Sequence, residues 1–143
     1  MDFVSSRGDL IRVTIESRLD YIDLLQALAE RITRLRCSDE EVVFHVGMST
    51  RESVANAICH GNRLDEHKQV DVEFHIHPDC LVICVDDAGD GFDPQVIPDP
   101  LAAENLLKPS GRGILFVRSF MDQVDFLRSP AGGTRLRMVK RTD

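Results

Sequence analysis

Three short clusters of polar residues and glycines have the residue types needed to bind a charged ligand and transfer a group. In the first cluster, Glu52, Asn56 and His60 are spaced four residues apart. Residues four apart share one face of a helix, so these side chains would form a polar stripe. A carboxylate and a carboxamide one turn apart could hold a hydrated Mg²⁺ ion and place a base beside it. An ordinary solvent-exposed helix face would give the same pattern.

The second cluster, from Asp87 to Phe92, directly follows a strand-like run. Gly89 and Gly91, at alternate positions, let the backbone approach a ligand closely. Side chains alternate between the two faces of the preceding strand, and this alternation directs the Asp87 side chain toward the core. A half-buried carboxylate can accept a hydrogen bond from an exocyclic amine, such as that of adenine. A glycine-rich turn without a ligand is the alternative interpretation.

The third cluster is Ser110-Gly111-Arg112-Gly113, expected directly before a helix. Free N–H groups at a helix start, together with the helix dipole, favour phosphate oxygens. Gly111 and Gly113 remove side chains that would block the ligand, and Arg112 or Lys108 could add positive charge. A flexible helix entry without a ligand is the alternative.

The elements that must position these clusters follow from hydrophobic periodicity. Alternation predicts strands at residues 10–15, 70–77, 81–85, 124–127 and 134–139. Helical spacing predicts helices at residues 19–36, 38–60 and 113–121. Residues 94–109 are expected to form a lid or binding loop, or else to be disordered. This order predicts an α+β fold, a two-layer sandwich with helices on one face of a mixed sheet.

Local signals refine the two first helices. The first helix should bury a stripe that includes Leu25 and Leu35. In the second helix, Ser38 is expected as the N-cap residue, with Glu41 at the third helical position. Gly61 is expected to end that helix in the left-handed conformation.

Composition limits the classes of function. The 143 residues, 43% of them hydrophobic, fit one domain over residues 1–143. A net charge of −7 argues against a nucleic-acid-binding surface, which needs clustered Lys and Arg. There is no apolar run long enough for a membrane span and no signal-peptide pattern at the N-terminus, so we expect a cytoplasmic protein.

The spacing of the cysteines and of two histidines gives only a weak indication of a metal-binding site. The four cysteines show no zinc-site spacing and are expected to be reduced and partly buried. His75 and His77 lie two apart on one strand face, where a metal pair is conceivable. Solvent-facing histidines are the favoured interpretation.

Taken in order, the three clusters resemble the N box and the two glycine boxes of the histidine-kinase-like (Bergerat) ATPases. Within that superfamily the sequence is most similar to the small anti-sigma-factor serine kinases. The resemblance covers about residues 11–139, with Ser53 in place of the usual alanine. The matching segments are Glu52–Gly61 (E-A-x-x-N-A-x-x-H-G), Asp87–Phe92 (D-x-G-x-G-[FI]), Ser110–Ile114 (S-G-x-G-[IL]), Phe120–Asp122 (F-M-D) and Gly132–Thr134 (G-G-T).

The resemblance implies ATP and Mg²⁺ as cofactors, and it implies a role for each matching residue. Asn56 would ligate Mg²⁺, and Glu52 would be the general base. Asp87 would bond the adenine amino group. The remaining roles are the adenine pocket for Gly89, Gly91 and Thr134, and phosphate-binding backbone amides for Gly111 and Gly113.

The function implied by the resemblance is that of an ATP-dependent serine/threonine protein kinase acting as an anti-sigma factor. Such a protein phosphorylates an anti-sigma-factor antagonist of the STAS type and could itself capture a sigma factor. A homodimer is also implied. The alternative is an ATP-binding regulatory module that captures a partner protein without physiological phosphoryl transfer.

Overall fold

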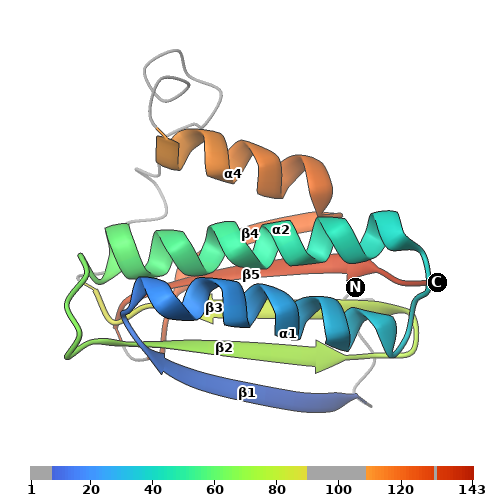
Figure 1. Cartoon of the computed structure of the whole chain (residues 1–143), viewed down its shortest axis with the longest axis horizontal. Helices are drawn as coiled ribbons and strands as arrows, with labels where there is room; N and C mark the ends of the chain where they lie inside the picture. Colours follow the sequence, from blue (N-terminus) through green and yellow to red (C-terminus); the bar gives the residue numbers. More distant parts are fainter. Residues whose placement is uncertain (1–7, 90–108, 131) are drawn as a thin grey trace.

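The structure is a computed structural model that describes residues 8–89, 109–130 and 132–143, with the backbone alone for residues 109–112. Figure 1 shows the elements in sequence colours. They are β1 (Asp9–Glu16), a 3₁₀ turn (Leu19–Tyr21), α1 (Ile22–Arg34), α2 (Glu40–Asn56), a π-helical turn (Ala57–Gly61), β2 (Gln69–Ile76), β3 (Cys80–Asp86), α4 (Pro109–Phe120), β4 (Gln123–Arg128) and β5 (Thr134–Arg141).

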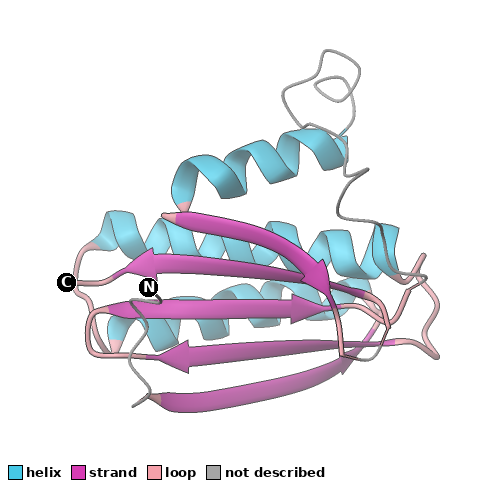
Figure 2. Ribbon diagram, turned by 180° about the vertical axis from the view of Figure 1, so that it is seen from behind, coloured by secondary structure: helices cyan, strands magenta, loops and turns pink. Residues whose placement is uncertain are grey.

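The described strands form one five-stranded sheet in the order β1-β2-β3-β5-β4. The helices lie on one face, and Figure 2 shows the other face from behind. The α+β two-layer sandwich is therefore confirmed. Every neighbouring pair of these strands is antiparallel, so the sheet is not mixed as expected. The antiparallel pair α1–α2 returns the chain to the end of β1, and β2 therefore runs back beside β1 (Figure 1).

The core lies between α1, α2 and the inner face of the sheet, as the periodicity predicted. In β2 the alternate residues Val70, Val72 and Phe74 are fully buried. The buried stripe of α1 includes Leu25, but Leu35 is 67% exposed. Leu35 was expected in that stripe. It is the C-cap residue, beyond the last turn that packs on α2.

The start of α2 differs by one residue from the sequence prediction. Asp39, not Ser38, is the N-cap residue. The Asp39 carboxylate accepts a hydrogen bond from the Glu41 N–H at 2.9 Å. This bond satisfies one of the free amides of the first turn, which is the role expected for Ser38.

The end of α2 also departs from the prediction. The α-helix ends at Asn56, and Ala57–Gly61 form a π-helical turn. Gly61 does not adopt the left-handed conformation. Arg63 and Leu64 adopt it instead, with φ of 52° and 60°. The chain therefore reverses two residues later than expected.

The helix expected at residues 113–121 begins earlier, at Pro109. Proline has no N–H and a fixed φ, so it is favoured at the first helical position. Ser110, Gly111 and Arg112 therefore lie in the first turn of α4 and not before it, and Gly113 is the fifth residue of the helix.

The outer face of the sheet is less exposed than the alternation suggested. His77 is buried and His75 is half-buried, so the expectation of two solvent-facing histidines is wrong. A second apolar cluster, made of Cys80, Val82, Cys84 and Val139, is buried on this face. The four cysteines are free thiols, and two of them are buried, as expected.

Among the described residues, no helix has the length and apolar character that a membrane crossing would require.

Adjacent leucines of α1 give a test of this fold. Leu25 is fully buried and Leu24 is 57% exposed. We expect Leu25→Ala to lower the free energy of unfolding by about 2–5 kcal/mol because it leaves a cavity in the core. Leu24→Ala should change it by no more than about 0.5 kcal/mol. Urea unfolding of both variants measures the difference, and equal losses would contradict the described orientation of α1.

Candidate functional site

Asp87 lies directly after β3 and is 8% exposed. Its Oδ1 atom accepts hydrogen bonds from the N–H of Gly89 at 3.0 Å and of Thr134 at 3.1 Å. The Asp87 N–H donates to the carbonyl of Thr134, which extends the β3–β5 pairing. Among the described residues, none donates a hydrogen bond to Oδ2. This oxygen is the acceptor that Asp87 can offer to a ligand.

Three glycines allow the backbone to pack around Asp87. A Cβ atom added at Gly61 would lie 2.2 Å from Asp87 Oδ2, and one at Gly133 would lie 2.1 Å from the Asp87 carbonyl oxygen. A Cβ at Gly89 would lie 2.2 Å from the Gly61 carbonyl oxygen. No side chain fits at these distances. Gly61 is therefore required by its contact with Asp87.

Asn62 is a buried residue of this site that sequence reasoning missed. Its Oδ1 accepts a hydrogen bond from the Ala88 N–H at 2.8 Å. Its Nδ2 donates to Ser17 Oγ at 2.8 Å and to the Gln69 carbonyl at 3.1 Å. One side chain thus joins the ends of β1 and β2 to the loop that carries Asp87. No signal in the single sequence distinguishes Asn62 from an ordinary loop asparagine.

A second group of site residues lies where α2 meets the first turn of α4. A Cβ atom added at Gly113 would lie 2.6 Å from Glu52 Oε2 and 3.8 Å from Asn56 Nδ2. The carboxylate and the carboxamide are therefore side by side, against the backbone of α4. The first amides of a helix have no partner within the helix, so this turn can present N–H groups to an anion.

The two groups meet at the C-terminal end of α2. Asn56 is the last residue of the α-helix, and the π-helical turn that follows brings Gly61 against Asp87. A π-helical turn has more residues than an α-helical turn. His60, which was expected on the stripe of Glu52 and Asn56, is exposed.

Most of the predicted site residues thus come together in two groups. Glu52, Asn56 and Gly113 form one group, and Gly111 lies in the same first turn of α4. The other group consists of Asp87, Gly89 and Thr134. Gly91 and Lys108 lie outside the described residues, as does the side chain of Arg112.

An ion pair on the opposite face fixes the strands that carry Asp87. Arg135 donates to both oxygens of Asp86 at 2.7 Å, through Nε and Nη2. The hydrogen bond with Asp86 raises the pKa of Arg135 above its usual value. Because this pair is bidentate, it holds β3 and β5 in register directly beside Asp87 and Thr134.

The sequence of this chain is similar to known proteins. Residues 15–140 match the family model of the histidine kinase-like ATPase domain. This chain belongs to that family. It is similar to anti-sigma F factors from Oceanobacillus iheyensis (31% identity over 117 residues, 80% of each chain) and Clostridium perfringens (32% over 103 residues, 71% of this chain and 74% of the relative). It is also similar to the serine-protein kinase RsbW of Staphylococcus aureus (22% over 144 residues, 96% of this chain and 89% of the relative).

The family model and the similar proteins confirm the resemblance that the sequence motifs indicated, which is to the anti-sigma-factor kinases among the histidine kinase-like ATPases. An ATPase domain implies a nucleotide site. The glycines around Asp87 and at Gly113 allow the backbone to approach Asp87 and Glu52 more closely than any side chain would permit, which fits a site built from backbone groups.

Asn62 gives a test of the framework around Asp87. Asn62→Ala leaves the Ala88 N–H and the Gln69 carbonyl without their partner, so we expect a loss of about 1–3 kcal/mol in the free energy of unfolding. Gln123→Ala, which removes an exposed amide bonded to Asp125, is the control and should cost no more than about 0.5 kcal/mol. Chemical unfolding measures both, and an unchanged Asn62→Ala variant would contradict the described network.

Proposed function

We propose that this chain is an ATP-dependent serine/threonine protein kinase that acts as an anti-sigma factor and phosphorylates a STAS-type antagonist. The observation that carries the proposal is the contact of Glu52 and Asn56 with the first turn of α4, one π-helical turn away from Asp87. This arrangement supports a site at one end of α2 in which Glu52 would be the base, Asn56 a metal ligand and Asp87 the purine acceptor. The names of the similar proteins support the same function.

Asp87 is the proposed adenine-recognition residue. Its Oδ1 is occupied by two backbone amides, so Oδ2 can accept a hydrogen bond from the amino group of adenine. A guanine base would bring a carbonyl oxygen to the same position, and two acceptors repel. Gly89 and Thr134, together with Gly91, would form the wall of the adenine pocket.

Asn56 and the first turn of α4 are proposed to hold the metal and the phosphates. The Asn56 side-chain oxygen is a hard ligand of the kind that Mg²⁺ accepts, with water completing the coordination. Gly111, in the first turn of α4, would offer its backbone amide, whereas a Cβ atom at Gly113, the fifth residue of the helix, would collide with Glu52 Oε2. Lys108 and Arg112 are proposed to add positive charge.

Glu52 is the proposed general base. Bound Mg-ATP would supply the γ-phosphoryl group, and its Mg²⁺ would offset the negative charge of the phosphates. Glu52 Oε2 points to the first turn of α4, where the phosphates are expected, so it can take the proton of a substrate serine hydroxyl. Phosphoryl transfer depends chiefly on positioning and charge stabilisation, and this set of groups is sufficient for it. We also propose that this activity takes place in the cytoplasm.

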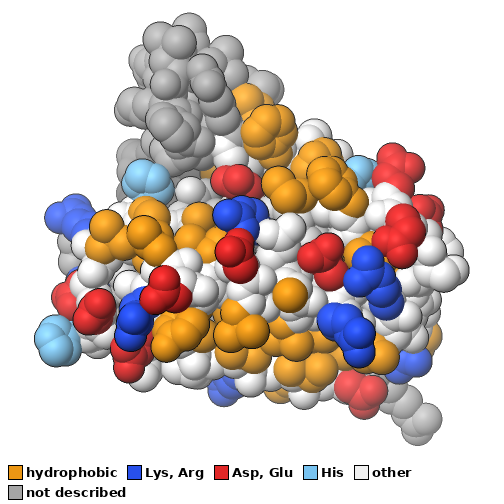
Figure 3. Space-filling model, viewed as in Figure 1, with side chains coloured by type: hydrophobic (Ala, Val, Ile, Leu, Met, Phe, Trp, Pro, Cys, Tyr) orange, Lys and Arg blue, Asp and Glu red, His pale blue; other side chains and the backbone are white. Residues whose placement is uncertain are grey.

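One observation also supports the alternative of partner capture without phosphoryl transfer. Aromatic rings gather where α2 meets α4: Phe120 lies 5.8 Å from Phe44 and 6.3 Å from Phe116 between ring centroids. Phe44 and Phe116 are each 54% exposed, and apolar side chains are visible on this face in Figure 3. Exposed aromatic groups are typical of protein-binding surfaces. A sigma factor or a second copy of this chain is the proposed partner.

Adenine recognition is tested with Asp87→Asn. Saturating Mg-ATP should stabilise the unsubstituted protein by about 2.7 kcal/mol at 100 times the Kd, whereas GTP should have little effect. An asparagine can keep its oxygen toward the two amides and would then turn an N–H donor to the ligand. We expect Asp87→Asn to weaken ATP binding by about 10- to 100-fold. Thermal unfolding with each nucleotide measures this. If ATP stabilises both proteins equally, Asp87 does not bind the purine.

The kinase function is tested with Glu52→Gln and radiolabelled ATP, using a STAS-type antagonist from the same organism. The substitution keeps the shape of the side chain and removes the base. We expect Mg-ATP binding to remain and phosphoryl transfer to fall by about 10²–10⁴-fold.

Glu66→Gln, which changes an exposed carboxylate outside the site, is the control and should transfer phosphate at the original rate. If the unsubstituted protein binds ATP and retains a partner protein without any transfer, the capture module is correct and the kinase is not. Normal transfer by Glu52→Gln would show that another group acts as the base.

A further inference from the structure

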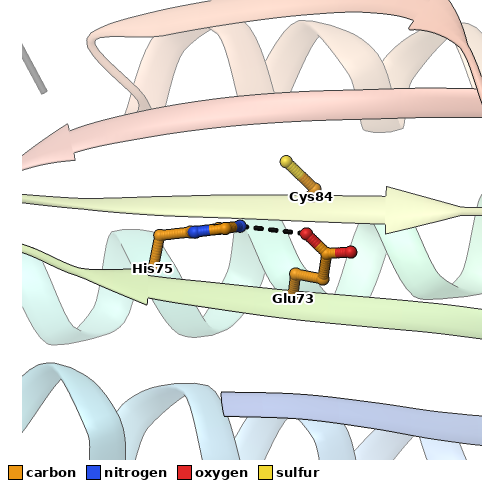
Figure 4. Close-up of side chains that lie close together, drawn as sticks. All are labelled: Glu73, His75 and Cys84. Atoms are coloured by element: carbon orange, nitrogen blue, oxygen red, sulfur yellow. Dashed lines mark hydrogen bonds and ion pairs between the residues drawn. The ribbon is translucent and has the colours of Figure 1, made fainter. Parts of the chain in front are cut away.

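Three potential metal ligands meet on the outer face of the sheet, opposite the helices. Glu73 and His75 lie on β2, and Cys84 is the cross-strand partner of Glu73 on β3 (Figure 4). One donor atom from each residue lies within 4.8 Å of the others. In the described part of the chain, no other group of three histidine, cysteine or acidic residues comes this close.

We propose that Glu73, His75 and Cys84 form a binding site for a thiophilic divalent transition metal, with Zn²⁺ as the best match. A nitrogen, a sulfur and a carboxylate oxygen are the ligand types that Zn²⁺ combines, and three protein ligands leave a fourth position for water. This site is separate from the proposed nucleotide site, because it lies on the other face of the sheet.

The spacing of the donors fits this metal. Tetrahedral Zn²⁺, with bonds of about 2.0–2.3 Å, holds neighbouring donors about 3.4–3.6 Å apart. His75 Nε2 and Glu73 Oε1 are 2.9 Å apart, and all three donors lie within 4.8 Å. Small side-chain rotations are sufficient to bring the donors to the metal, and the strands need not move.

The charges around Glu73 leave one of its oxygens to the metal. Oε2 faces Arg12 at 3.1 Å and Arg135 at 3.4 Å, whereas Oε1 faces His75. Burial alone would raise the pKa of Glu73, but the His75 hydrogen bond and the two arginines outweigh it and lower the pKa. The carboxylate is therefore ionised. Arg135 also forms an ion pair with Asp86, and the Asp86 carboxylate therefore offsets the positive charge of Arg135 beside the proposed metal site.

The thiol of Cys84 must lose its proton when the metal binds. Burial raises the pKa of Cys84 to about 11, which makes the free thiolate scarce at neutral pH. On binding, the S–H bond breaks, a metal–sulfur bond forms and the proton passes to solvent. A thiolate ligand favours ions that form strong metal–sulfur bonds over Mg²⁺ or Ca²⁺.

A hollow of about 280 Å³ gives the metal access to the cluster. His77, Val82, Arg135 and Arg137 complete its lining. His75 is half-exposed at the rim, while Cys84 and Glu73 are buried at its floor. The space is large enough for the ion and a bound water.

Titration of the full chain with Co²⁺, which takes Zn²⁺ sites and absorbs light, tests the proposal. The protein is first treated with a chelator and kept reduced with a phosphine. We expect one Co²⁺ per chain, with a near-ultraviolet thiolate-to-cobalt band and the strong visible bands of tetrahedral Co²⁺, all removed by Zn²⁺. Cys84→Ser should abolish the near-ultraviolet band. Cys37→Ser, which removes a thiol outside the cluster, should keep it.

His75→Gln is a second test, because replacing the buried Cys84 by serine could prevent folding. It changes a half-exposed side chain and should weaken Co²⁺ and Zn²⁺ binding at least about tenfold, because even second-shell losses cost about 10–100-fold. His67→Gln, which changes an exposed histidine, should bind as before.

The proposal is overturned if no thiolate band appears, or if Cys84→Ser and His75→Gln bind Co²⁺ as the original does. Each readout is independent of ATP, so a negative result here leaves the proposed kinase function untouched.

Discussion

The candidate site depends on one carboxylate, that of Asp87, which backbone groups hold without a cation. A nearly buried carboxylate needs strong hydrogen bonds to remain charged, and two amides supply them to Oδ1. None of the described arginine, lysine or histidine side chains pairs with it. Oδ2 therefore keeps its capacity to accept a hydrogen bond from a ligand.

This arrangement explains why the end of α2 is irregular. The Gly61 backbone must reach Asp87, and the π-helical turn after Asn56 carries it there. The Asn62 side chain then links the loop of Asp87 to the sheet. It accepts a hydrogen bond from the Ala88 N–H and donates to two groups near the ends of β1 and β2. Such turns are often found at functional sites. Here the turn joins Asn56, at the proposed metal position, to Asp87, at the proposed purine position.

Periodicity predicted the elements and the core, because burial of alternate residues such as Val72 and Phe74 is decided by the repeat alone. It also placed Asp87 correctly at the edge of the core. It failed where tertiary contacts decide. Gly61 was assigned to a helix stop because its contact with Asp87 is remote in sequence. His75 and His77 were predicted to face solvent, but on the outer face of this sheet His77 is buried and His75 is half-buried.

The two faces of the sheet depend on each other through the β3–β5 pairing. Asp86 and Arg135 point outward and form a bidentate ion pair, while the adjacent Asp87 and Thr134 form the inner bond. Side chains alternate along a strand, so a slip of one residue would exchange these faces. It would bring Asp86, not Asp87, to the inner side and break both pairs together. The outer ion pair therefore fixes the register in which Asp87 Oδ1 accepts the Thr134 amide and Oδ2 lies against Gly61.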